Sequence, residues 1–261
     1  MRGLLQRCQP RHDLYRSFGD CMEAMAVAIS NSVDLVQREQ REARYLEIVG
    51  RYETQIIESF ARVMAELTLA LESGFGDVLG ALFHDLELHS KAKGQFFTPY
   101  VLSRAIADML VGDPAATRAA IEERGYLIAM EPACGSGSMV IALAEGLRMQ
   151  GVNYQRHLHV TAVDIDPRAI HMAYVQLSLL HIPARLVVGD ALSGEIREQW
   201  FTPAHILGGW TARLATAPKG KTTIAPITSD LPVGAGGSTS QDREKATTYD
   251  PGRLPRQLSL F

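Results

Sequence analysis

A glycine-rich turn with an acidic residue in front of it is the segment of this chain best suited to chemistry. Residues 131–138 read EPACGSGS. Gly135 and Gly137 stand one residue apart, so the backbone can turn sharply there and let a ligand approach closely. Glu131 places a carboxylate beside that turn. A predicted strand precedes the segment and a predicted helix follows it, so we expect a ligand site at the turn.

Two classes of cofactor bind to turns of this kind. A dinucleotide site requires a third glycine, where this chain has Val140, and it places a pyrophosphate over the helix N-terminus. The Glu131 carboxylate would repel a pyrophosphate. It would attract S-adenosylmethionine, which carries an ammonium and a sulfonium group and no phosphate. Charge therefore favours S-adenosylmethionine.

Two more acids end the next two predicted strands. Asp164, in TAVDIDP, can accept hydrogen bonds from both ribose hydroxyls, and Ile165 can pack on the adenine face. Asp190, in VVGDAL, can accept from the adenine amino group. Each acid alone could instead cap the following helix. Three acids at one edge of a parallel sheet predict a cofactor site.

Four motifs in order, GQFFTP (94–99), EPACGSGSM, AVDID and GDAL, carry a family resemblance. Over about residues 77–210 the chain resembles the adenine-specific DNA methyltransferases, especially the modification subunits of type I restriction systems. It is also similar to short methylase-like proteins of plasmids, phages and integrative elements. The resemblance implies a Rossmann-like α/β fold that binds S-adenosylmethionine. Taken together, the charges at the strand ends and the resemblance imply ten cofactor-binding residues, of which Phe97 and Thr98 rest on the resemblance alone: Phe97, Thr98, Glu131, Ala133, Gly135, Gly137, Asp164, Ile165, Asp190 and Ala191.

The GQFFTP segment has a plain structural interpretation as well. Thr98 could be the N-cap of a helix whose first residue is Pro99. The resemblance implies that Phe97 and Thr98 also hold the methionine end of the cofactor. The two roles are compatible.

The family's acceptor block is not found. The resemblance implies an Asn-Pro-Pro-Phe segment after the third acid, whose Asn side chain and proline carbonyl accept from the target amine while the aromatic ring stacks on the flipped base. None of the 12 prolines is adjacent to another. Methylation of a cytosine carbon would need a thiolate, and Cys134 lies inside the glycine turn, where we expect a small packing residue. We therefore assign no catalytic residue.

Two functions remain open. The first is a cofactor-binding protein of this family that is weakly active or inactive alone and acts on or protects DNA. The second is a functional adenine-specific methyltransferase that uses a partner subunit or an unconventional acceptor site around residues 202–205.

Periodicity predicts the elements that must position these residues. Apolar runs at 126–130, 158–163 and 184–188 alternate with helical patterns at 100–110, 138–149 and 167–180, which indicates a parallel sheet covered by helices. Upstream, one long amphipathic helix should end near residues 73–74 and a second should span 77–89. These helices could pack on the cofactor domain or on a partner subunit. We expect a helical region over 1–90, the cofactor domain over 91–210 and a disordered tail over 211–261.

Bulk composition limits the partners and the location. The formal net charge is −3, so DNA contact must come from a local patch or from a partner such as a specificity subunit. Three cysteines without a CxxC pair, no signal-like N-terminus and no long apolar run indicate a cytoplasmic protein without a membrane segment. The histidines lack metal-site spacing, so we expect no metal. Trp200, Phe201 and Trp210 could stack on a base, but packing at the sheet edge is the favoured interpretation.

The last five residues resemble a short motif by which bacterial replication and repair proteins bind the polymerase sliding clamp. They are Gln257, Leu258, Ser259, Leu260 and Phe261. Two leucines and a terminal phenylalanine suit an apolar pocket, and the glutamine amide can hydrogen-bond at its rim. The preceding residues 211–256 would act as a tether that raises the local concentration of the folded domain at DNA. A chance apolar end, or one that folds back on the core, is the alternative.

Overall fold

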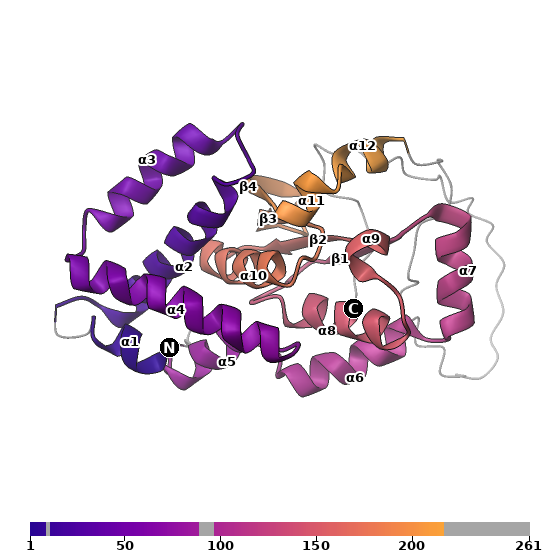
Figure 1. The fold of residues 1–261 in the computed structure, drawn as a ribbon, viewed down its shortest axis with the longest axis horizontal. Helices are drawn as coiled ribbons and strands as arrows, with labels where there is room; N and C mark the ends of the chain where they lie inside the picture. Colours follow the sequence, from indigo (N-terminus) through magenta and orange to yellow (C-terminus); the bar gives the residue numbers. More distant parts are fainter. Residues whose placement is uncertain (9–10, 89–96, 217–261) are drawn as a thin grey trace.

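The computed structural model describes residues 1–8, 11–88 and 97–216, and it has the mixed α/β architecture that the sequence predicts (Figure 1). The elements follow in the order α1 (Arg2–Gln6), α2 (Leu14–Ser30), α3 (Arg38–Val49), α4 (Thr54–Ser73), α5 (Val78–Asp85), α6 (Tyr100–Val111), α7 (Pro114–Arg124), β1 (Leu127–Glu131), α8 (Ser138–Met149), α9 (Tyr154–His157), β2 (Leu158–Asp164), α10 (Pro167–Leu179), β3 (Ala184–Asp190), β4 (Glu195–Phe201), α11 (Pro203–Leu207) and α12 (Trp210–Ala215).

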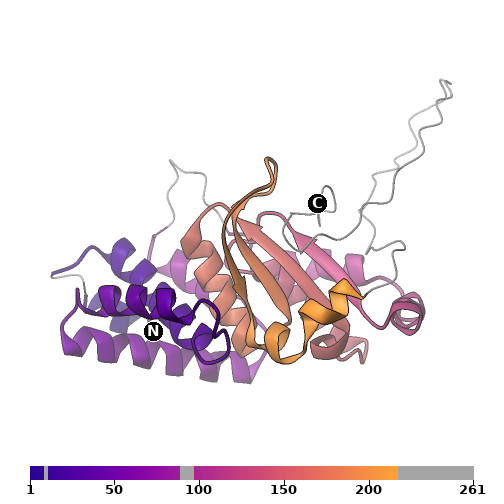
Figure 2. The ribbon, with the colours of Figure 1, turned by 90° about the horizontal axis from the view of Figure 1, so that it is seen from above.

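The sheet has the strand order β1-β2-β3-β4. The first three strands are parallel, with Leu127 opposite Leu158 and Val160 opposite Ala184. This confirms the predicted strand–helix alternation, in which α8 and α10 form the crossovers. The fourth strand is antiparallel to β3 and was not predicted, because its sequence EIREQWF has too few apolar residues to alternate clearly. Figure 2 shows the β3–β4 hairpin reaching beyond the other strands.

Helices cover one face of the sheet in two layers. Helices α8 and α10 pack on the strands, and α2 packs on the outer side of α10 (Figures 1 and 2). A single hydrophobic cluster runs from Leu5 in α1 through Phe18 in α2 and Tyr174 in α10 to Val160 in β2. The sequence left open whether the N-terminal helices pack on the cofactor domain or on a partner subunit. They pack on the cofactor domain and share its core.

The predicted long helix is two helices. Helix α3 ends at Val49, Gly50 follows, and Glu53 has extended backbone angles before α4 begins. The apolar spacing continues across this break, which is why periodicity alone joined the two. The end of α4 at Ser73 agrees with the prediction.

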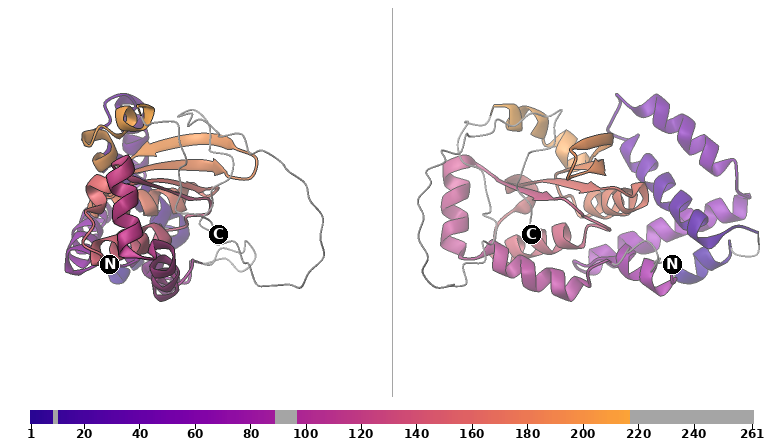
Figure 3. Two further views of the ribbon diagram at one scale, coloured as in Figure 1. Left: turned by 90° about the vertical axis from the view of Figure 1, so that its right-hand side faces the viewer. Right: turned by 180° about the vertical axis from the view of Figure 1, so that it is seen from behind.

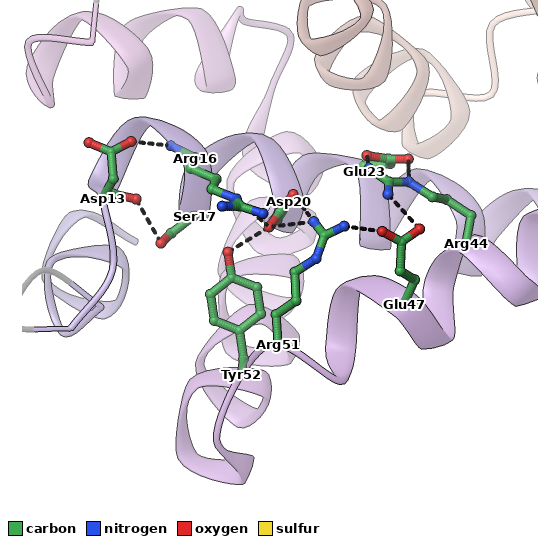
Figure 4. Close-up of polar contacts among 9 residues, drawn as sticks. All are labelled: Asp13, Arg16, Ser17, Asp20, Glu23, Arg44, Glu47, Arg51 and Tyr52. Carbon is green, nitrogen blue, oxygen red and sulfur yellow. Dashed lines mark hydrogen bonds and ion pairs between the residues drawn. The ribbon is translucent and has the colours of Figure 1, made fainter.

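A network of charged side chains joins α2 to α3 (Figure 4). Arg44 donates to both carboxylate oxygens of Glu23, at 2.6 and 2.9 Å. Asp20 accepts from the Tyr52 hydroxyl at 2.7 Å and faces Arg51 at 3.4 Å. The buried residues of α3 are Arg41 and Ile48, and the polar contacts of Arg44, Arg51 and Tyr52 join α3 and the residues after it to α2.

Helices α6 and α7 lead into β1. Helix α6 agrees with its prediction to within a residue and packs on α8. Its first residue is Tyr100, so Pro99 precedes the helix and Thr98 is exposed without a capping bond; the predicted capping role of Thr98 is wrong. Helix α7 was missed, although its Asp113–Pro114 start is a typical N-cap followed by proline.

Helices α11 and α12 cover part of the second face of the sheet. Helix α12 occupies residues that we had assigned to a disordered tail, and Trp210 at its start is fully buried. Its ring lies against His159 in β2. Trp200 packs on Tyr174 and His171 of α10. Both tryptophans are therefore packing residues, which agrees with the interpretation favoured from the sequence.

The five residues 257–261, which resemble a clamp-binding motif, lie outside the described residues.

Across the described ranges, no helix combines the length and the apolar character needed to cross a membrane.

Candidate cofactor site

The glycine turn after β1 has the conformation that only glycine adopts easily. Gly135 and Gly137 have φ values of 52° and 94°, in the left-handed region that other residues avoid. Space is also restricted: a Cβ atom on Gly135 would lie 2.8 Å from Cδ1 of Phe97. The Gly137 amide donates to the Cys134 carbonyl at 2.8 Å, which closes the turn. The predicted turn is thus present, with Phe97 against it.

Glu131 is the most unusual group in the site. Its side chain is buried, with 1% of its surface exposed, at the end of β1. One carboxylate oxygen accepts from the Ala133 amide at 3.1 Å, and the other, Oε2, is buried without a hydrogen-bond partner. Burial, with a smaller contribution from the charge of Asp164, raises the pKa of Glu131 to about 7 against the lowering effect of the Ala133 amide. A buried acceptor without a donor is costly, and a ligand cation would relieve that cost.

Asp164 lies beside Glu131 at the end of β2. Its Oδ2 accepts from the Gly135 amide at 2.9 Å and its Oδ1 from the Asp166 amide at 2.9 Å. Burial raises its pKa, while the amides of Asp166 and Gly135 lower it. A carboxylate has about four acceptor sites, so these amides do not exhaust its capacity. The carboxylate therefore positions the glycine turn and can still accept from ligand hydroxyls.

Asp190 lies at the end of β3, one strand beyond Asp164 along the same edge of the sheet. The strands are staggered, so that Glu131 is level with Ala162 and Asp164 with Val188, two residues before Asp190. Asp190 stands at the start of the β3–β4 turn, where its carboxylate accepts from the Leu192 amide at 2.9 Å. That amide lowers its pKa. The hairpin turn explains this acid without a ligand.

Two apolar side chains flank the acids. Ile165 follows Asp164 and is 65% exposed, although isoleucine is usually buried. Phe97 is half-buried, between Gly135 and the rings of Phe83 and His84. Both therefore offer apolar surface beside the glycine turn. Thr98 is exposed, and Ala191 packs on the small apolar cluster of Met130, Val163 and Val187.

The residues present fit S-adenosylmethionine. The unpartnered Oε2 of Glu131 suits the cofactor's ammonium group, Asp164 suits ribose hydroxyls and Ile165 suits an adenine face. These two neighbouring carboxylates would repel a pyrophosphate. Bound there, the cofactor would supply an electrophilic methyl group on its sulfonium.

Cys134 has no chemical role that its surroundings support. The thiol is buried, and burial together with Asp164 and Glu131 raises its pKa well above the ordinary value. A thiol held protonated is a poor nucleophile. This confirms the expectation of a small packing residue.

The segment 202–205, considered above as an unconventional acceptor site, lies at the wrong end of the sheet. Phe201 pairs with Arg185 near the start of β3, whereas the glycine turn is at the carboxyl ends of the parallel strands. Seven residues of strand separate the two ends, about 20 Å. Figure 3 shows α11 on the side away from the hairpin turn. Thr202 is buried and donates to the Ile182 carbonyl, so this part of the earlier hypothesis is wrong.

A buried histidine pair near that amino end was not predicted. His159 in β2 and His205 in α11 share a 2.8 Å hydrogen bond, and burial lowers the pKa of both. Their spacing of 46 residues hides this contact from any reading of the sequence. Among the described residues, no group of three or more potential ligands could hold a metal ion.

Comparison with known proteins assigns this chain to one family. The family model for N-6 DNA methylase matches residues 72–207, slightly more than half of the chain. The methylase subunit of the type I restriction enzyme MjaIX of Methanocaldococcus jannaschii is 27% identical over 132 residues, which cover 49% of this chain and 21% of that subunit. The chain thus spans about a fifth of the length of this relative. No solved structure matches.

Proposed function

Because the chain belongs to the N-6 DNA methylase family, we propose that it binds S-adenosylmethionine at the glycine turn between β1 and α8. Glu131 accepts the ammonium group, Asp164 the ribose hydroxyls, and Ile165 and Phe97 pack on the cofactor's apolar surfaces. Asp190 accepts from the adenine amino group, and Ala191 lies beside it. Ala133, Thr98 and the two glycines contribute backbone close to the methionine end.

The observation that carries this proposal is the buried Oε2 of Glu131, which lacks a hydrogen-bond donor. A purely structural glutamate would gain nothing from that position, because desolvation of an unpaired carboxylate destabilises the fold. A cationic ligand gives the residue a function that offsets the cost.

Equilibrium dialysis with labelled S-adenosylmethionine tests the proposal. We expect saturable binding that excess unlabelled cofactor abolishes and a nicotinamide dinucleotide does not. Equal competition by the dinucleotide, or no saturable binding, would refute it.

We further propose that the chain alone transfers methyl groups to DNA weakly or not at all, and that it acts on or protects DNA with a partner. Without residues that orient the target amine, much of the roughly 7–11 kcal/mol available from positioning is lost. The alternative function, a working adenine-specific methyltransferase, then requires a partner subunit to complete the acceptor site. Incorporation of labelled methyl groups into unmethylated DNA measures the methyl-transfer activity of the purified chain. Robust adenine methylation without a partner would overturn the proposal that the chain is weakly active or inactive alone.

The C-terminal sequence supports a separate proposal, that residues 257–261 bind the bacterial sliding clamp. A peptide of about the last ten residues should bind purified clamp in fluorescence polarisation. Changing Leu260 and Phe261 to Ala should abolish binding, whereas no binding by the unmodified peptide at high micromolar concentration would end the proposal.

A further inference from the structure

Helix α5 is linked to the cofactor turn at both of its ends, directly through Asp77 and by way of Phe97, and none of the sequence motifs lies in this helix. We propose that α5 is a brace for the glycine turn, and that Asp77, Ser136 and Gln176 are positioning residues that fix the turn for cofactor binding. The part concerning binding rests on the function proposed above. The positioning itself can be measured without a cofactor.

Asp77, at the start of α5, is the centre of the contact. Its Oδ1 accepts from the Gly80 amide and from Nε2 of Gln176, both at 2.9 Å. Its Oδ2 accepts from the hydroxyl of Ser136, the residue between the two glycines of the turn. One buried carboxylate therefore links α5, α10 and the glycine turn.

Gln176, in α10, completes the network. Its Nε2 also donates to the Ser136 carbonyl at 2.9 Å, and its Oε1 accepts from the Leu79 amide at 3.0 Å. Ser136 is thus held through its hydroxyl by Asp77 and through its carbonyl by Gln176. Because Gln176 is fully buried, its amide group has no solvent alternative, and the orientation of the Ser136 peptide is strongly determined.

Gly80 makes room for these contacts. A Cβ atom there would lie 2.6 Å from the Ser136 hydroxyl and still closer to the Asp77 carboxylate. The backbone of Gly80 is within a regular helix, so conformational freedom is not the reason for glycine. Any side chain at this position would push Asp77 and Ser136 apart.

The other end of α5 contacts the turn through Phe97. The Phe83 and Phe97 ring centroids are 5.1 Å apart, and the His84 ring packs edge-on against Phe97. The Phe97 ring in turn lies against Gly135. The two glycine-turn residues 135 and 136 are therefore both held by α5, one through an aromatic contact and one through the hydrogen-bond network.

Gly80→Ala tests the brace directly, because it separates Asp77 from Ser136 without changing either. Gly76→Ala is the matched control, since a Cβ there meets no atom within 4 Å. Hydrogen exchange of the amides at residues 133–137 in the cofactor-free protein is the first measurement. We expect Gly80→Ala to raise their exchange about tenfold and to weaken S-adenosylmethionine binding about tenfold, while Gly76→Ala changes neither.

Asp77→Ala and Asp77→Asn separate positioning from simple destabilisation. The Ala variant removes every acceptor, whereas Asn keeps Oδ1 for Gly80 and Gln176 and can donate to the Ser136 hydroxyl. We expect Asn to restore near-normal exchange in the turn and Ala to match Gly80→Ala, at temperatures where thermal unfolding shows all variants folded. Wild-type exchange in the turn of Gly80→Ala would overturn the brace even if the cofactor binds. Failure of the wild-type chain to bind the cofactor would refute the proposed function. The exchange results would still show whether α5 positions the glycine turn.

Discussion

Two buried carboxylates lie on opposite sides of the same glycine turn and differ in how they are satisfied. Asp77, on the α5 side, has donors on both oxygens: Gly80 and Gln176 on one and Ser136 on the other. Glu131, on the strand side, has one amide donor and one oxygen without a partner. The turn is thus held on one side and left with an open acceptor on the other.

This difference separates a structural acid from a ligand-binding acid without reference to any motif. A fully hydrogen-bonded carboxylate stabilises its surroundings, whereas a buried and incompletely paired one costs stability that only function explains. The comparison predicts that removing the charge of Glu131 stabilises the chain, whereas removing the Asp77 carboxylate destabilises it. Three experiments test or sharpen it.

The largest expected effect is a gain of stability in Glu131→Gln. In the folded chain Glu131 keeps its proton up to a pKa of about 7, whereas the unfolded side chain loses it near the ordinary glutamate value of 4.5. The folded state therefore binds more protons in this window, so the free energy of unfolding falls as pH rises from about 4.5 to about 7 and stays lower above it. The shift corresponds to about 3 kcal/mol.

Urea denaturation of the wild-type chain and Glu131→Gln at pH 5 and pH 8 measures this gain. We expect the variant to be more stable at pH 8, by up to about 3 kcal/mol, and close to wild type at pH 5. Asp77→Ala should instead lose stability at both pH values, because three donors lose their acceptor. A Glu131→Gln variant that is no more stable at pH 8 would remove the distinction between the two acids.

The second effect concerns Asp164, which serves both the turn and the ligand. Asp164→Ala should weaken S-adenosylmethionine binding by about 1.5–3 kcal/mol through lost charged hydrogen bonds. It should also raise amide exchange at Gly135, whose donor loses its acceptor. Calorimetric titration gives the affinity. An unchanged affinity would mean that the cofactor does not use this carboxylate.

The smallest effect concerns the apolar surface beside the acids. Ile165→Ala should weaken cofactor binding by about 1 kcal/mol, because part of the removed side chain would be buried by the ligand. Leu192→Ala is the control, since Leu192 is 99% exposed at the hairpin turn. Equal effects of the two changes would show that Ile165 is not at the adenine.

The sequence predicted the parts of the fold that repeat a simple period. The three parallel strands and helices α8 and α10 each bury a continuous apolar pattern, and their ends were placed within about two residues. Glu131 and Asp164 were brought together correctly, because parallel strands end at one edge of the sheet. Residues 50–53 show the limit: the spacing of apolar side chains continues through the break between α3 and α4.

What could not be predicted depends on contacts between residues far apart in the chain. Asp77 and Gln176 are 99 positions apart, and nothing local marks either as part of the turn. The position of segment 202–205 depends on β4 being antiparallel, which reverses the chain and carries the segment away from the glycine turn. Each is a consequence of topology rather than of residue type.

The most direct test of the account is the number of protons released when S-adenosylmethionine binds at pH 7. With a pKa of about 7, about half of the Glu131 side chains carry a proton in the free protein, and accepting the ammonium group requires that proton to leave. Calorimetry in two buffers of different ionisation enthalpy should therefore show release of about half a proton per bound cofactor, and none in Glu131→Gln. Cofactor binding with no proton release in the wild-type chain, or no binding at all, would contradict the assignment of Glu131 as the acceptor.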